Sequence, residues 1–429
     1  MENSRRSFLH QFGALSASPF ALSALASEWN NLLAYLDSQR QRPTKDIARD
    51  EVYWQEVAKA YRVSTDFINL ENGYYSLAAW PVLKAQWQHI KEVNKKPSYY
   101  MRNQQWDDRH RIKQALADFA GCSVDEMVIC RNTTEALDTV ILGLNLEPGD
   151  EAIMTNQDYG SMLATFNQRA RRDNIVNRII SLPLHPKNDQ EIVDAYEQAI
   201  TSQTKVMLVT HLINITGQVL PVQKICAMAH SYGVEVICDS AHALGQLDFK
   251  IQDLDCDYWG TSLHKWVGAP LGNGMLYIKK EKISQVWPLL GDDTYSDDDI
   301  RKFEHHGTLP VTGQLSILDA LEFQESIGVP RKQARLRYLK QYWTEKVKDT
   351  PGVIINTPWE EERSSGIANV GVANLKPHEL ADRLMNKYNI FTVAIDNEAL
   401  KGIRVTPHLY TSLNELDKFV IALKELASA

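Results

Sequence analysis

Two ionisable side chains in residues 238–274 lie where short apolar runs end. Asp239 follows the run VEVIC, which is typical of a buried strand. Open α/β sheets bind ligands at the carboxyl ends of such strands. Lys265 follows a second short run and stands beside Trp266, close to Gly268. An aromatic, partly dry setting lowers the pKa of a lysine amine and favours its use in a Schiff base.

Together these side chains indicate a pyridoxal phosphate site. A carboxylate facing a pyridine nitrogen keeps that nitrogen protonated, so that the ring remains an electron sink. The alternative is that Asp239 is a turn residue and Lys265 a surface cation with no shared role. An aspartate followed by a lysine in this order favours the cofactor site.

The segment RNTTEALD has the features of a phosphate-binding helix start. Thr133 and Thr134 stand at the beginning of a predicted helix. The free N–H groups and the dipole at a helix N-terminus favour a dianion there. Taken alone, the two threonines are better explained as helix caps.

Short apolar runs alternate with helical patterns from about Met127 onward. The expected strands are MVIC, EAIM, NRIISL, VMLVT, VEVIC, DYWGTS and GMLYI. This alternation predicts a mostly parallel sheet covered by helices on both faces. We expect this large α/β domain over residues 67–310, after a helical segment over 27–66. Residues 311–429 indicate a small α+β domain.

The motifs DSAHALGQ and TSLHKW resemble those of the class V aminotransferase family of fold-type I pyridoxal phosphate enzymes. The similarity extends from Phe67 to Leu426. The segments FINLENGYYS and FEHHGT resemble the isopenicillin N epimerase-like branch of that family. The resemblance implies an α/β fold, with a mostly parallel seven-stranded sheet flanked by helices and a small α+β C-terminal domain.

The resemblance also implies roles for individual residues. Lys265 matches the lysine that carries the cofactor, and Asp239 matches the partner of the pyridine nitrogen. His242 and Asn214 match side chains beside the phenolic oxygen of pyridoxal 5′-phosphate. We expect Lys265, Asp239 and His242 to be catalytic. The other implied cofactor contacts are Thr133, Thr134, Ser262 and His264 at the phosphate, Tyr159 stacked on the ring, and Thr308.

Thr308 matches a threonine that comes from the partner subunit in relatives, which implies a homodimer with composite sites. Arg404, within GIRVTPHLY, matches the arginine that binds the substrate carboxylate, a task suited to its planar fork. Its alternative role is an ordinary ion pair. Asn72 and His306 are further candidates for the substrate pocket.

The resemblance implies an enzyme acting at Cα of an amino acid or of a small molecule that contains one. Group transfer is favoured. The alternatives are epimerisation, C–S or α,β-elimination on the same scaffold, and a cofactor-binding protein without turnover. Cysteine desulfurases of this family use a cysteine on a loop of the C-terminal domain. No cysteine follows Cys256, which excludes that chemistry at that position.

Charge and composition exclude some partners. The 46 basic and 54 acidic residues give a net charge of −8, whereas nucleic-acid-binding proteins normally carry a basic excess. The five cysteines show no zinc spacing, so we expect no metal site. The expected partner is a small amino compound.

The N-terminal segment resembles a twin-arginine export signal over residues 1–26. Arg5 and Arg6 precede an uncharged stretch that ends in Ala24, Leu25 and Ala26. That stretch is too short and too weakly apolar for a stable membrane anchor. We therefore expect a periplasmic or exported protein. The alternative is a disordered tail or an amphipathic N-terminal helix.

Overall fold

The structure is a computed structural model that describes residues 19–428. The chain divides into two compact units, with the boundary between Pro43 and Thr44. The first unit holds helix α2 (Pro19–Ser38), which crosses the predicted cleavage position after Ala26. The twin-arginine motif lies outside the described residues. Within residues 19–428, no helix combines the length and the apolar character needed to span a membrane.

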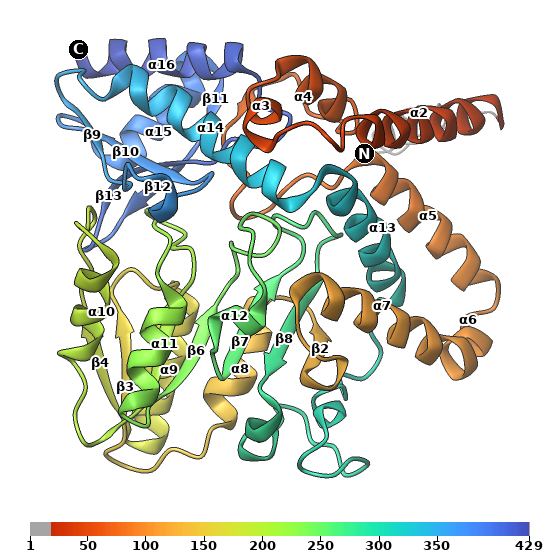
Figure 1. Cartoon of the computed structure of the whole chain (residues 1–429), viewed down its shortest axis with the longest axis vertical. Coiled ribbons are helices and arrows are strands. Elements are labelled where there is room, and N and C mark those ends of the chain that lie inside the picture. Colours follow the sequence, from red (N-terminus) through yellow and green to blue (C-terminus); the bar gives the residue numbers. More distant parts are fainter. Residues whose placement is uncertain (1–18, 429) are drawn as a thin grey trace, which may run out of the picture. The chain divides into compact units, whose positions relative to one another are not determined.

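A seven-stranded sheet forms the large domain of the second unit (Figure 1). Its strand order is β2-β8-β7-β6-β5-β3-β4, and only β8 runs antiparallel to its neighbours within the sheet. This confirms the expected mostly parallel sheet of seven strands. The bounds are β2 (Met127–Cys130), β3 (Glu151–Thr155), β4 (Val176–Ile180), β5 (Thr204–Thr210), β6 (Glu235–Asp239), β7 (Tyr258–Ser262) and β8 (Gly274–Ile278).

Helices cover both faces of this sheet (Figure 1). Because successive side chains of a strand point to opposite faces, a sheet buried on both sides is apolar along its whole length. Val206 and Leu208 of β5 pack with Leu137 and Phe166 in one large apolar cluster. The flanking helices are α7 (Gln105–Ala120), α8 (Thr133–Gly143), α9 (Gly160–Asp173), α10 (Asp189–Glu197), α11 (Val222–Ser231) and α12 (Ile251–Leu254).

Six more helices of the second unit include three long ones, of 16, 17 and 19 residues, and three short ones, of 3, 5 and 8 residues. They are α3 (Thr44–Ala48), α4 (Glu51–Ala58), α5 (Trp80–Lys95), α6 (Pro97–Tyr99), α13 (Val311–Ile327) and α14 (Val329–Val347). A π-helical turn (Tyr100–Gln104) leads into α7. Single 3₁₀ turns cover Val124–Glu126, Lys280–Gln285, Ile300–Phe303 and Glu361–Arg363.

The C-terminal part is a four-stranded antiparallel sheet with helices packed against it. Its order is β12-β13-β10-β9, formed by β9 (Val353–Ile355), β10 (Ala368–Val372), β12 (Val393–Asp396) and β13 (Lys401–Val405). Helices α15 (Pro377–Tyr388) and α16 (Leu413–Ser428) complete this small α+β domain. Its core includes Trp343 and Phe419, whose rings meet edge to face.

A two-stranded parallel pair joins the start of the large domain to this small domain. β1 (Ile68–Asn69) pairs with β11 (Ile390–Phe391). An isolated parallel β-bridge between Glu71 and Thr406 extends this pairing. The segment that contains Glu71 is therefore held against the small domain by backbone pairing.

Candidate active site

The predicted cofactor lysine and its aspartate lie at the same edge of the sheet. Asp239 is the last residue of β6, and β7 runs parallel beside it with Gly260 opposite Asp239. Lys265 follows in the turn after β7. The Nζ atom of Lys265 lies 3.3 Å from Nε2 of His242. The order of the strands thus brings together the three residues predicted to be catalytic.

The environment of Lys265 changes the protonation of its amine. Loss of contact with water lowers the pKa of Lys265 to about 8. The negative charges of Asp239 and Glu71 oppose this shift, whereas the charge of Arg404 adds to it. An amine with this pKa can both accept and donate a proton near neutral pH.

His242 faces Lys265 as a neutral ring. Burial holds the pKa of His242 well below its usual value, and the charges of Lys265 and Arg404 add to this effect. The indole N–H of Trp266 donates to Nδ1 of His242 over 3.2 Å. Because Nδ1 accepts that bond, the proton of the neutral imidazole is on Nε2, which faces the lysine. The sequence analysis did not assign a role to Trp266, although it stands next to Lys265.

A second buried carboxylate belongs to the same region. The hydroxyl of Thr210 and the backbone N–H of Thr155 each donate to Asp158 over 2.7 Å. Burial raises the pKa of Asp158 to about 7, and the charge of Asp239 acts in the same direction. Burial also raises the pKa of Asp239, against the opposing effect of the Ala241 N–H. Sequence reasoning missed Asp158, although it directly precedes Tyr159 after a buried strand.

The predicted phosphate contacts meet at the start of α8. Asn132 caps this helix by accepting the N–H of Glu135. The N–H and hydroxyl of Thr133 lie 3.0 and 2.7 Å from Oγ of Ser262, at the end of β7. A Cβ at Gly274 would lie 2.6 Å from Cα of Asn132, so only glycine allows β8 to approach this closely. The arrangement leaves a helix N-terminus beside two hydroxyl groups.

The remaining members of the predicted set lie near this edge. His264 is buried and its Nδ1 lies 3.2 Å from the carbonyl oxygen of Asn273. Thr134 is half-buried in the first turn of α8. Tyr159 and Asn214 line one cavity of about 510 Å³, together with Tyr74 and residues 394–399 of the small domain. These residues form the end of β12 and the loop after it.

Arg404 is completely buried and already binds a carboxylate of its own chain. Its Nε and Nη2 atoms donate to the two carboxylate oxygens of Glu71 over 3.0 and 2.6 Å. Its Nη1 atom donates to the carbonyl oxygen of Asn214 over 3.2 Å. The ring of Tyr74 lies 3.9 Å from the guanidinium carbon. Sequence reasoning weighed an ion pair for Arg404 but did not name Glu71, which the motif LENG contains.

The last three predicted residues contact groups other than Lys265 and His242 in the described chain. Asn72 uses its side chain for structure, because its amide donates to the carbonyl oxygen of Thr406 over 2.8 Å and accepts the hydroxyl proton of Tyr410. His306 and the exposed Thr308 line a cavity of about 440 Å³ beside α7. The placement of Thr308 in a partner's site stays a prediction.

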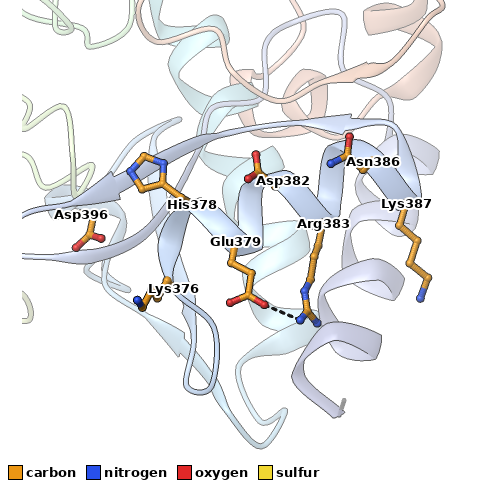
Figure 2. A pocket seen from close by; sticks show the side chains of 8 residues that line it. All are labelled: Lys376, His378, Glu379, Asp382, Arg383, Asn386, Lys387 and Asp396. Carbon is orange, nitrogen blue, oxygen red and sulfur yellow. Dashed lines mark hydrogen bonds and ion pairs between the residues drawn. The ribbon is translucent and has the colours of Figure 1, made fainter.

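A larger cavity lies elsewhere on the small domain. It measures about 610 Å³ and follows one side of α15, where charged side chains of both signs point outward (Figure 2). Glu379 and Arg383 form an exposed ion pair of 2.6 Å there. None of the predicted site residues lines this cavity, so the site is assigned to the sheet edge.

The groups at the sheet edge fit pyridoxal 5′-phosphate. Lys265 supplies an amine of lowered pKa, Asp239 a buried carboxylate, and α8 a helix N-terminus beside two hydroxyl groups. Within residues 19–428, no group of three or more His, Cys, Asp or Glu side chains is placed to hold a metal ion. The donor set is that of an organic phosphate cofactor.

Comparison with known proteins agrees with this geometry. Residues 81–417 match the family model for aminotransferase class V. The chain belongs to this family. Among curated relatives of the family, isopenicillin N epimerase of Streptomyces clavuligerus is 26% identical over 74% of this chain and 84% of its own length. The enzyme of the same name from Amycolatopsis lactamdurans is 28% identical over 75% of this chain and 85% of its own.

Other family members carry different activities in their names. Cysteine desulfurase of Haloferax volcanii is 27% identical over 74% of this chain and 78% of its own length. Among solved structures, the cystine C–S lyase C-DES, in complex with cysteine persulfide, has a TM-score of 0.77 at 20% identity, covering 84% of this chain and 98% of its own. This solved structure shares the fold of the chain, which confirms the predicted fold class.

Proposed function

We propose that this chain is a pyridoxal 5′-phosphate-dependent enzyme that acts at Cα of an amino acid or a related small amino compound. The observation that carries the proposal is the lysine amine of pKa about 8, placed 3.3 Å from a neutral histidine at the sheet edge where Asp239 ends β6. The cofactor, when bound, withdraws electrons from the bonds at the reacting carbon.

The chain's own residues have separable tasks in this proposal. Lys265 carries the cofactor and, once its amine is free, moves the proton at the reacting carbon. The N–H of His242 orients that amine, and Trp266 fixes the imidazole by binding its other nitrogen. Asp239 provides the buried negative charge, and the start of α8 with Ser262 binds the phosphate.

Transfer of the amino group is the reaction that we favour, in keeping with the family. Epimerisation is the second candidate, because two curated relatives are named isopenicillin N epimerase. Elimination is the third, because a structural neighbour is a C–S lyase. Persulfide chemistry of the desulfurase kind is not proposed, because the residues after Cys256 contain no cysteine.

Two further features are part of the proposal. We infer a homodimer from the match of Thr308 and from exposed aromatic side chains on α5, α6 and α7, where Trp87, Tyr99 and Trp106 are 49%, 58% and 55% exposed. Sedimentation of the purified protein at several concentrations tests the dimer. We also infer export, supported by the twin arginine of the N-terminal segment.

Borohydride trapping of the cofactor tests the assignment of Lys265. Peptide mapping should locate the trapped cofactor on Lys265, and Lys265→Ala should abolish the adduct, whereas the exposed-lysine control Lys387→Ala should leave it intact. Trapping that persists in Lys265→Ala would contradict the assignment.

The products separate the three reactions. A screen of D- and L-amino acids, with and without an oxo acid, should yield a new oxo acid for transfer. Exchange of the Cα hydrogen for solvent deuterium without an oxo acid indicates epimerisation, and release of ammonia with an oxo acid indicates elimination. Consumption of none of these amino acids, together with no turnover of simple amines such as ethylamine, would support the cofactor-binding protein without turnover.

A further inference from the structure

We propose that Glu71 is a specificity-determining residue. Its carboxylate binds the guanidinium of Arg404 in the place that a substrate carboxylate would otherwise take. The site then selects amines whose reacting carbon bears no free carboxylate. This inference rests on the proposed function and narrows its substrate class. It also reassigns Arg404, which the resemblance would make the partner of the substrate's carboxylate.

The first support is the geometry of the pair. Both oxygens of Glu71 accept from Arg404, in the side-on, two-bond arrangement through Nε and Nη2. Such charge-assisted pairs with two parallel bonds are the strong form of this contact. A substrate carboxylate would therefore have to compete with one that is already attached to the protein.

The second support is that Glu71 is itself held in place. Its Oε1 atom also accepts the backbone N–H groups of Gly73 and Tyr74, each over 2.9 Å. Glu71 is only 7% exposed, and its backbone forms a bridge to Thr406. Displacement of this carboxylate would leave a buried negative charge without its cation and would break four hydrogen bonds, which is costly.

The third support is the enclosure of the guanidinium. A Cβ at Gly73 would lie 3.1 Å from Cζ of Arg404, so the backbone of Gly73 packs closely against the guanidinium. The ring of Tyr74 lies 3.9 Å from Cζ, and Asn214 accepts from Nη1. Arg404 has no exposed surface. The cavity of about 510 Å³ is lined by Tyr74, not by Arg404.

The fourth support is the charge of that cavity. Its carboxyl groups are those of Asp158, Asp396 and Glu398, and no Lys, Arg or His lines it in the described chain. A free carboxylate would find no cation there to replace Arg404. An amine whose reacting carbon bears no carboxylate brings no negative charge into this cavity and therefore needs no cation there.

The test compares propanoate with propanamide, which have nearly the same shape but differ in charge. Calorimetry on the cofactor-loaded protein should show no tighter binding of propanoate than of propanamide. Glu71→Ala removes the carboxylate from Arg404 and leaves space beside the guanidinium for the carboxylate of propanoate. We expect this variant to bind propanoate at least tenfold more tightly than propanamide.

Matched variants complete this test. The double variant Glu71→Ala with Arg404→Gln should lose the gain, because the cation is gone. Glu379→Ala, which removes the same side chain from the exposed pair with Arg383 (Figure 2), should behave as the wild type. A wild type that prefers propanoate tenfold, or a Glu71→Ala variant without any gain, would overturn the proposal.

A folding defect in Glu71→Ala would not end the test, because the double variant carries no unpaired buried charge. L- and D-alanine are then compared with ethylamine through the absorbance change of the bound cofactor. The double variant should keep the wild-type ratio of affinities, and a tenfold loss confined to alanine would overturn the proposal. Failure to trap the cofactor on Lys265 would instead refute the proposed function. The propanoate measurement tests Glu71 separately, because it needs no turnover.

Discussion

Lys265 and His242 face one another through nitrogen atoms 3.3 Å apart, and the histidine cannot rotate without losing the bond from Trp266. The imidazole therefore presents an N–H, not a lone pair, to the amine of the lysine. In this arrangement His242 holds the amine of Lys265 and does not take its proton. The lysine is left as the group that moves a proton at the sheet edge.

The lowered pKa of Lys265 predicts how cofactor capture depends on pH. In cofactor-free protein, the rate of pyridoxal phosphate capture should rise with pH and level off above about pH 8, because the neutral amine is the reacting form. An ordinary lysine would still be protonated there. Stopped-flow absorbance gives the rate, and a parallel series with butylamine corrects for ionisation of the aldehyde.

The charged neighbours of Lys265 predict the direction in which substitutions shift the pH midpoint of cofactor capture. Glu71 raises the pKa of Lys265 and Arg404 lowers it. Glu71→Gln should move the midpoint of capture to lower pH, and Arg404→Gln to higher pH. A midpoint above pH 10 in the wild type would contradict the burial of the amine.

Asp158 predicts a pH dependence of stability. Its pKa is about 7 in the folded chain, raised from the ordinary aspartate value of 3.8, so the folded state binds more protons than the unfolded state between pH 4 and 7. The free energy of unfolding contributed by this group therefore falls as pH rises through that window. Asp158→Asn, which mimics the protonated form, should become more stable than the wild type by about 2–4 kcal/mol between pH 5 and 8. Urea unfolding of the two cofactor-free proteins at several pH values measures the difference. If the free energies of unfolding of the two proteins changed with pH in parallel, the prediction would be wrong.

Gly274→Ala should disrupt the start of α8. The added Cβ would meet the backbone of Asn132 at 2.6 Å, and neither backbone can move alone. We expect a loss of about 1–3 kcal/mol in stability and weaker phosphate binding. Equilibrium dialysis with pyridoxal phosphate measures the second effect. Gly291→Ala, at a position with open space around the site of the new Cβ, is the matched control.

N-terminal sequencing tests the export proposal. Protein isolated from fractionated native cells should begin near Ser27 and lie outside the cytoplasmic membrane. Intact Met1 in the cytosolic fraction would contradict export. Replacing Arg5 and Arg6 with lysine should block processing, because twin-arginine signals depend on the arginine pair.

The parts of the site that the sequence could predict are local. Asp239 and Lys265 each follow an apolar run, and two parallel strands carry their ends to one edge of a sheet. The pair of Glu71 and Arg404 follows from no such pattern, because the two residues stand 333 positions apart. Asp158 was missed for another reason, since an aspartate before a helix is usually explained as a turn residue. The antiparallel direction of β8 was likewise not evident from its apolar composition.

The separation of Glu71 and Arg404 has a consequence for how the protein is made. Asp239, His242 and Lys265 lie in one short stretch, so the lysine pocket can form once the strands of the large sheet have left the ribosome. The arginine of β13 emerges much later, and the segment around Glu71 stays unpaired until then. A nascent chain released before Lys401 would hold the lysine pocket without the ion pair that closes it. During synthesis, the residues proposed for catalysis are therefore present before the ion pair that is proposed to select the substrate.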